Sequence, residues 1–139
     1  MRLILEVQRF NPKKDKEPSL QHYEVEVQPT DRILDALVHI KNFQDSSLSF
    51  RKSCAHGVCG SDGMVINGVE RLACKTLVKD VAGQENTVIT IEPLRSLPVQ
   101  RDLMVDYTHF FDTYRIVKPF LIPVKKPEHA ENIQTPQQR

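Results

Sequence analysis

Three cysteines and one aspartate in this chain are spaced like ligands of an iron–sulfur cluster. Cys54 and Cys59 are separated by four residues, Asp62 follows after two more, and Cys74 lies further on. The spacing C-x4-C-x2-C…C is typical of a [2Fe–2S] cluster, which needs four protein donors because each iron is tetrahedral. Here Asp62 stands at the third position, and the chain has only 3 cysteines. We therefore predict that three thiolates and one carboxylate hold a [2Fe–2S] cluster and that the chain carries electrons.

Glycines are concentrated around these candidate ligands. Four of the 5 glycines in the chain fall within a short stretch: Gly57, Gly60, Gly63 and Gly68. Glycine allows sharp turns and close approach of the backbone to another group. A loop around a cluster needs both, because its N–H groups must point at the sulfur atoms and tune the reduction potential.

Other uses of the cysteines fit less well. Cys54 and Cys59 are at the upper limit of zinc-ligand spacing, and Cys74 has no nearby second cysteine to complete a zinc knuckle. A Rieske centre is suggested by Cys54-Ala55-His56, but a second histidine-bearing knuckle is not found near Cys74. A disulfide is disfavoured by the odd cysteine count. Zinc and uncoordinated thiols remain the main alternatives.

Composition places the chain among ordinary globular proteins. Hydrophobic residues make up 40% of its 139 residues, and 19 Lys+Arg stand against 18 Asp+Glu. This balance gives no indication of a nucleic-acid partner. No apolar stretch is long enough for a membrane span, and the start MRLILEVQRF is predicted to be a strand, not a signal peptide. Unpaired cysteines favour a reducing compartment.

Alternating apolar residues near the start predict a β-hairpin. Leu3, Leu5 and Val7 alternate with more polar residues, and residues 22–27 alternate strictly after a polar turn. A helix follows, with Thr30 as the expected N-cap. Its predicted buried stripe consists of Ile33, Leu34, Leu37, Val38 and Ile40.

The middle of the chain predicts a cluster loop and the rest of a sheet. Residues 49–63 lack periodicity and are assigned to the cluster. Residues 64–66 and 69–74 flank Asn67-Gly68, which is typical of a type I′ hairpin turn, and residues 88–91 form a last strand. This order predicts an α+β domain over residues 1–97, whose mixed sheet grips one helix.

The character of the chain changes after Pro93. Residues 98–139 are predicted to form a linker, a helix at about 101–117 and a proline-rich tail. The apolar stripe of this helix is expected to pack against the sheet domain or a partner. His109 within it is expected to be structural. No second cysteine-rich motif follows Cys74.

Three segments resemble the iron–sulfur subunit of succinate dehydrogenase and fumarate reductase. They are LEVQRFNP, LSFRKSCAHGVCGSDGMVINGVERLACKT and LPVQRDLMVDYTHFFDTYRIVKPFLI. The resemblance covers essentially the whole chain. The resemblance implies a β-grasp fold of the plant-type ferredoxin kind, with Cys54, Cys59, Asp62 and Cys74 as ligands. Some members of the family have cysteine where Asp62 stands, and bacterial succinate dehydrogenases that resemble this chain have aspartate.

The resemblance also implies partners and a location. Iron–sulfur subunits of this family pass single electrons from a flavoprotein (FAD) subunit toward quinone. Membrane anchor subunits are further partners in the family. A second domain of the family holds [4Fe–4S] and [3Fe–4S] clusters, and we expect that domain to be absent here. We expect the assembled enzyme to have succinate dehydrogenase activity. We expect this subunit to lie peripherally on the cytoplasmic side of a bacterial inner membrane. The alternative is fumarate reductase. The fragment itself is expected to be soluble.

No residue of this chain is predicted to be catalytic, so alone it is expected to be only an electron carrier. The ligand set would carry a charge of −2 oxidised and −3 reduced by standard formal charges. Nearby cations either offset this charge or are simply solvated: Arg51, Lys52, Arg71 and Lys75. A non-redox β-grasp interaction module is the remaining alternative, since fold alone does not decide function.

Overall fold

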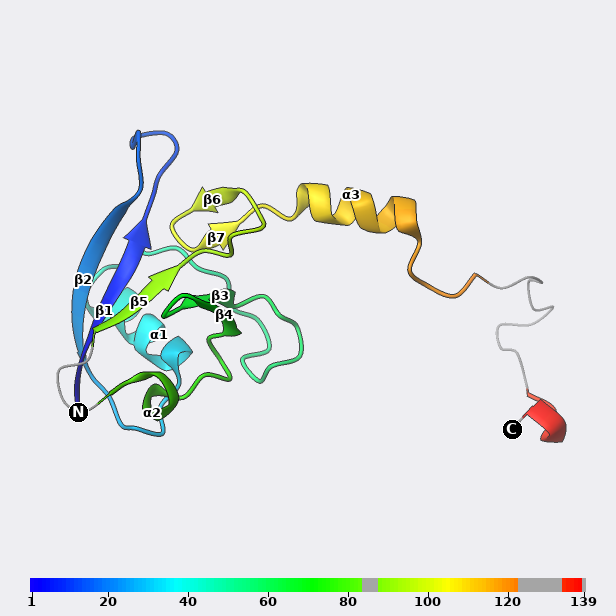
Figure 1. Ribbon diagram of the computed structural model, residues 1–139, viewed down its shortest axis with the longest axis horizontal. Helices are drawn as coiled ribbons and strands as arrows, with labels where there is room; N and C mark the ends of the chain where they lie inside the picture. Colours follow the sequence, from blue (N-terminus) through cyan, green and yellow to red (C-terminus); the bar gives the residue numbers. More distant parts are fainter. Residues whose placement is uncertain (84–87, 123–133, 139) are drawn as a thin grey trace. The chain divides into compact units, whose positions relative to one another are not determined.

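A computed structural model describes residues 1–83, 88–122 and 134–138 (Figure 1). The chain divides into two compact units, Met1–Tyr107 and Thr108–Arg139, which are described separately. None of the described helices has the length and apolar character that crossing a membrane requires.

The first unit is built on a mixed five-stranded sheet. The strand order is β2-β1-β5-β3-β4; β1 and β5 are parallel, and the other neighbours are antiparallel. The prediction of an α+β fold with a mixed sheet and one main helix is therefore confirmed. The strands are β1 (Arg2–Arg9), β2 (Ser19–Glu26), β3 (Gly63–Ile66), β4 (Val69–Leu72) and β5 (Val88–Glu92).

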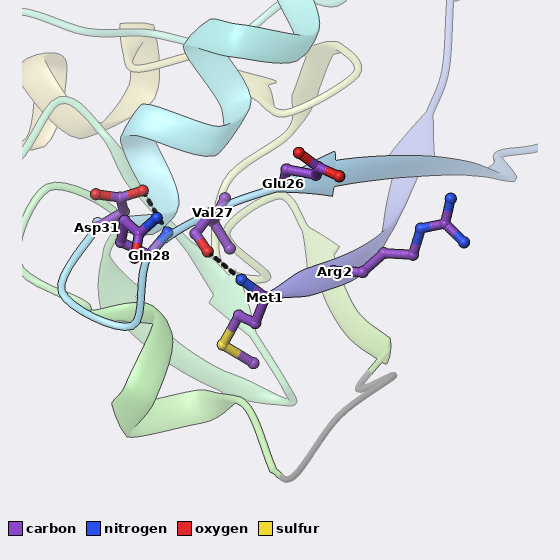
Figure 2. A pocket seen from close by; sticks show the side chains of 6 residues that line it. All are labelled: Met1, Arg2, Glu26, Val27, Gln28 and Asp31. Carbon is purple, nitrogen blue, oxygen red and sulfur yellow. Dashed lines mark hydrogen bonds between the residues drawn. The ribbon is translucent and has the colours of Figure 1, made fainter.

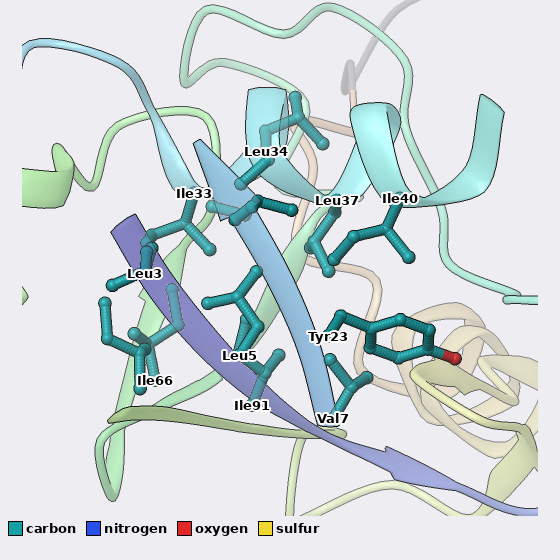
Figure 3. Packing of buried hydrophobic residues seen from close by; sticks show 14 of the residues in the cluster. Leu3, Leu5, Val7, Tyr23, Ile33, Leu34, Leu37, Ile40, Ile66 and Ile91 are labelled. Carbon is teal, nitrogen blue, oxygen red and sulfur yellow. The ribbon is translucent and has the colours of Figure 1, made fainter. Parts of the chain in front are cut away.

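The core lies between this sheet and helix α1 (Ile33–Phe43). Alternate residues of β1 are fully buried, as the period of two predicts. Figure 3 shows side chains of α1 meeting those of the strands. Of the predicted helical stripe, four residues are buried and Val38 is partly buried.

The start of α1 differs from the prediction. Arg32, not Thr30, is the N-cap. The carboxylate of Asp35 accepts a hydrogen bond from the Arg32 N–H at 3.0 Å, which satisfies an otherwise unpaired donor of the first turn. Thr30 instead lies in the turn before it, where the Asp31 carboxylate accepts from the Gln28 N–H.

The turn between β3 and β4 has the predicted form. Asn67 and Gly68 both have positive φ, 49° and 78°, as a type I′ turn requires. The Asn67 side chain also joins the turn to its surroundings, accepting from Thr90 N–H and donating to the carbonyl of Val81. A short helix, α2 (Val78–Val81), was not predicted.

The helix predicted at about 101–117 begins only at Thr108. Residues before it form a hairpin of β6 (Val99–Arg101) and β7 (Met104–Val105). Asp102 in the turn has φ of 47°, which a right-handed helix excludes, and Leu103 is buried in the core of the first unit. Residues 101–107 have an apolar pattern that suits a helix, but their tertiary contacts favour the hairpin. The division after residue 97 stays a prediction, but the compact unit extends to Tyr107.

The second unit contains α3 (Thr108–Val117) and a short 3₁₀ turn, Pro136–Gln138. No residue of α3 is buried in the described structure, and His109 is exposed. The predicted packing of its apolar stripe therefore stays a prediction. Most of the proline-rich tail, at 123–133, lies outside the described residues.

Candidate functional site

The four candidate ligands come from two parts of the first unit. Cys54, Cys59 and Asp62 belong to the loop between α1 and β3, here called the cluster loop (residues 49–62), whereas Cys74 follows β4. Two backbone donors after β4 join these parts. The Ala73 N–H donates to the Asp62 carbonyl at 3.1 Å, and the Cys74 N–H donates to the Asp62 carboxylate at 2.6 Å.

The backbone of the cluster loop surrounds the Cys54 sulfur with donors. Cys54 Sγ accepts from the N–H groups of His56, Val58 and Cys59 at 3.5, 3.4 and 3.4 Å. The loop can curl this way because Ala55 and Gly57 have left-handed φ, 57° and 85°. Successive N–H groups that converge in this manner form a concave anion site.

These donors favour the thiolate over the thiol. Hydrogen bonds from the backbone N–H groups of Cys59, His56 and Val58 lower the pKa of Cys54 to about 6. The Ser61 hydroxyl and its N–H likewise lower the pKa of Cys59, whose sulfur lies 3.2 Å from Ser61 Oγ. Because thiolate is the form that binds metals, both side chains are prepared as ligands.

Cys74 differs from the other two cysteines. It is 1% exposed, and burial together with the neighbouring Asp62 carboxylate raises the pKa of its thiol. The backbone N–H of Gly57 partly offsets this rise in pKa, and the charge of Cys54 adds to it. The structure therefore brings Cys74 to the cluster loop. All three cysteines are free in the structure.

The Asp62 carboxylate is buried with one oxygen left over. The residue is 3% exposed, and Oδ1 has no hydrogen-bond partner among the described residues. A buried carboxylate oxygen without a partner is unfavourable unless a further group, such as a metal ion or a water molecule, binds it. A hard, anionic donor beside Cys74 fits an iron ligand. In the described part of the chain, no three His, Cys, Asp or Glu side chains are grouped to hold a single metal ion.

Residues 4–112 match the family described as 2Fe-2S iron-sulfur cluster binding domain. The chain belongs to this family. Its cofactor class, a [2Fe–2S] cluster, is thereby confirmed, and the non-redox interaction module loses its support.

Named relatives of this 2Fe–2S domain are longer proteins. The fumarate reductase iron-sulfur subunit of Haemophilus influenzae is 42% identical over 123 residues, which are 88% of this chain and 46% of that protein. The succinate dehydrogenase iron-sulfur subunit of Coxiella burnetii is 37% identical over 139 residues, which are 99% of this chain and 57% of that protein. The chain thus spans about half the length of these relatives.

A solved structure shows the same fold. It is described as the Mycobacterium smegmatis Sdh1 complex in the apo form, and one of its chains matches with a TM-score of 0.80 and 31% identity. The match covers 96% of this chain and 54% of that chain. The resemblance to iron–sulfur subunits of succinate dehydrogenase and fumarate reductase is confirmed.

Arg32 and Lys75 contact the cluster loop of the 2Fe–2S domain. Arg32 donates to the Ala55 carbonyl at 3.0 Å and so supports the left-handed residue after Cys54. The stem of Lys75 lies against Gly57, so close that a Cβ there would be 2.6 Å from Lys75 Cδ. Arg32 was missed because nothing in its spacing relates it to the cysteines.

The other predicted cations are placed differently. Arg51 is directed at the β6–β7 hairpin, donating to the Val105 carbonyl and to Gln100. Lys52 and Arg71 are exposed. Whether they offset the charge of a bound cluster stays a prediction.

A separate hollow lies away from these ligands, at the N-terminus. Figure 2 shows that the Met1 ammonium donates to the Val27 carbonyl and that the Gln28 N–H donates to Asp31. The volume of this hollow is about 470 Å³, and none of the four candidate ligands lines it. Its Arg2 side chain pairs with Glu24, which is not part of the lining.

Proposed function

We propose that this 2Fe–2S domain is the electron-carrying part of an iron–sulfur subunit in a complex of the succinate dehydrogenase and fumarate reductase type. Cys54, Cys59, Asp62 and Cys74 would hold the cluster. A bound [2Fe–2S] cluster supplies a site that gains and loses one electron without bond formation. The chain itself contributes ligands, burial and hydrogen bonds, and contributes no acid–base chemistry.

The buried Asp62 carboxylate is the main observation that supports the proposed ligands. It stands at the third position of the cysteine pattern, contacts the N–H of Cys74, and keeps Oδ1 without a partner in the described structure. An aspartate with only a structural role would be expected to use both oxygens when buried. The N–H groups around Cys54 support the same assignment, since they stabilise negative charge on sulfur.

Fumarate reductase is the better supported of the two activities. Relatives from Haemophilus influenzae, Escherichia coli and Mycobacterium tuberculosis carry that name, and one from Coxiella burnetii is named succinate dehydrogenase. Our sequence-based preference for succinate dehydrogenase is thus the weaker alternative. In either case the proposed partners are a flavoprotein subunit and membrane anchor subunits, at the cytoplasmic side of a bacterial membrane.

Reconstitution with iron and sulfide under anaerobic conditions tests the cofactor and its ligands. We expect a red-brown protein with about two irons and two sulfides per chain. Dithionite should bleach it and produce the electron paramagnetic resonance (EPR) signal of a one-electron-reduced [2Fe–2S] centre. Stoichiometric zinc without sulfide would overturn the proposal.

The direction of catalysis needs the assembled complex. Co-expression of the full-length subunit with its flavoprotein and anchor subunits allows fumarate reduction and succinate oxidation to be measured on one preparation. We expect the rate of fumarate reduction with a reduced quinol to exceed that of succinate oxidation. The opposite ratio would favour succinate dehydrogenase and leave the cluster assignment intact.

A further inference from the structure

A buried carboxylate outside the ligand set fastens the start of the cluster loop. Asp102, in the turn between β6 and β7, is 2% exposed. Its Oδ1 accepts from the N–H of Phe10 at 3.0 Å, and its Oδ2 accepts from the N–H of Ser49 at 2.9 Å. Phe10 directly follows β1, and Ser49 is the first residue of the cluster loop. One side chain therefore joins the sheet to that loop.

The backbone of the same turn repeats both links in the reverse direction. The Asp102 N–H donates to the Phe10 carbonyl at 2.8 Å, and the Leu103 N–H donates to the Ser49 carbonyl at 3.1 Å. Each partner segment is thus held by a reciprocal pair of hydrogen bonds. Two guanidinium groups face the carboxylate: Arg9 Nε lies 3.1 Å from Oδ1, and Arg101 Nε lies 4.0 Å from Oδ2. Arg9 also pairs with Asp45. A charged acceptor with paired donors makes stronger hydrogen bonds than a neutral one.

A second contact fastens the loop two residues further along. Arg51 donates to the Val105 carbonyl at 3.2 Å and to the Gln100 side chain at 3.0 Å. Its guanidinium lies 5.6 Å from the centre of the Tyr107 ring. The hairpin of β6 and β7 thereby holds Ser49 and Arg51, while the first candidate ligand, Cys54, follows only three residues after Arg51.

We propose that Asp102 is a positioning residue for the cluster: it fixes the start of the cluster loop and so sets where Cys54 stands relative to Asp62 and Cys74. The cluster-related part of this inference rests on the proposed function. Its structural part concerns the chain alone. Groups that orient metal ligands without touching the metal typically change metal affinity by about 10–100-fold when removed.

Asp102→Asn tests this role with little change in shape. An amide has only one carbonyl oxygen, so one of the two N–H groups, of Phe10 or of Ser49, must face an NH₂ group instead of an acceptor. Tyr23→Phe is the matched control, because the Tyr23 hydroxyl contacts Arg9 and Asp45 in the same network but does not contact Ser49. Arg51→Gln is a second, independent variant should Asp102→Asn fold poorly.

Two measurements on the 139-residue chain separate the possible outcomes. Amide hydrogen exchange without cluster should speed up at residues 49–54 by about tenfold in Asp102→Asn and Arg51→Gln, but not in Tyr23→Phe. Iron release to a chelator from reconstituted protein should be about tenfold faster in the same two variants, with an altered EPR line shape.

The two variants are compared at temperatures equally far below their unfolding temperatures. The proposal would be overturned if Asp102→Asn and Tyr23→Phe then had equal exchange rates and equal rates of iron release. Faster exchange with unchanged iron release and spectrum would also overturn it, since the loop would then be loosened without consequence for the cluster. If the wild type assembled no cluster, the proposed function would fail, and positioning of a cluster with it. The exchange data would still decide whether Asp102 fixes the loop.

Discussion

The carboxylate of Asp62 accepts a hydrogen bond from the backbone N–H of Cys74 at 2.6 Å and keeps its other oxygen free of hydrogen bonds within the described structure. The two residues are separated by the whole β3–β4 hairpin, so the contact depends on the hairpin turn at Asn67-Gly68. One oxygen thus orders the backbone of a candidate ligand, and the other has no partner that would compete with the proposed bond to iron.

Substitutions of Asp62 should separate these two roles. Asp62→Asn retains an acceptor for the Cys74 N–H but removes the anionic donor, so iron content should fall while the fold persists. Asp62→Ala should lose both roles, with an added loss of about 1–3 kcal/mol in unfolding free energy for the unpaired N–H. Asp62→Cys should assemble a cluster with a shifted potential. Iron analysis and urea unfolding measure these outcomes.

Asp80→Asn, an exposed charge change on α2, is the control for Asp62. If Asp62→Ala kept the iron content and spectrum of the wild type, another donor such as Ser61 or His56 would have to be the fourth ligand.

Gly57→Ala should weaken the cluster loop more than Gly60→Ala. Both glycines have positive φ, which costs a residue with a Cβ roughly 1–2 kcal/mol. At Gly57 the added Cβ would also lie 2.6 Å from Lys75 Cδ, whereas nothing lies within 4 Å at Gly60. Unfolding free energies of both variants, with and without Lys75→Ala, measure the difference. The Lys75→Ala background should rescue only Gly57→Ala, and rescue of both would contradict this account.

Acid should destabilise the protein partly through Asp45. Hydrogen bonds from the hydroxyls of Ser47 and Tyr23, and from Arg9, hold the pKa of Asp45 well below its usual range. The unfolded chain therefore takes up this proton first as the pH falls. The stabilisation is fully present above about pH 4 and is lost as the pH falls further toward the folded-state pKa.

Asp45→Asn should accordingly lower the unfolding free energy by about 1–3 kcal/mol at pH 7 and flatten its decline below pH 4. Urea unfolding between pH 2 and pH 7 provides the measurement. Parallel curves for wild type and variant over the acid range would show that Asp45 contributes no pH dependence.

Val58 is expected to face the flavoprotein partner. It lies between two candidate ligands and is 77% exposed. Within the full-length subunit, Val58→Asp should slow electron exchange with the flavoprotein or weaken assembly while leaving the cluster spectrum unchanged. Val69→Asp, at a valine of β4 that is 50% exposed, is the control. Wild-type rates and assembly with Val58→Asp would show that the loop does not face the flavoprotein.

Local sequence patterns predicted most of the sheet, because burial of alternate residues is visible in each strand separately. Leu3, Leu5 and Val7 are all fully buried, and the Asn67-Gly68 turn has the expected backbone. The hairpin at 99–105 could not be predicted in this way. Its apolar residues also suit a helix, and only contacts with Phe10 and Ser49 decide between the two.

Local spacing predicts the candidate ligands of the site but not the residues that support them. Cysteine spacing identified the candidate ligands, since the chemistry of iron restricts which residues serve. The Arg32 side chain acts through a hydrogen bond to a residue 23 positions away, and the Asp102 side chain acts through two, to residues 53 and 92 positions away. Charged residues at such distances carry no local signal.

The parallel pairing of β1 with β5 has a consequence for the order of events during synthesis. β5 lies in the middle of the sheet, yet it is the last of its five strands to leave the ribosome. All four candidate ligands emerge before it. Glu92, the end of β5, follows Cys74 by 18 residues, so at 5–20 residues per second the central strand is delayed by about one to four seconds. We therefore expect iron and sulfide to be inserted productively only after β5 has paired with β1.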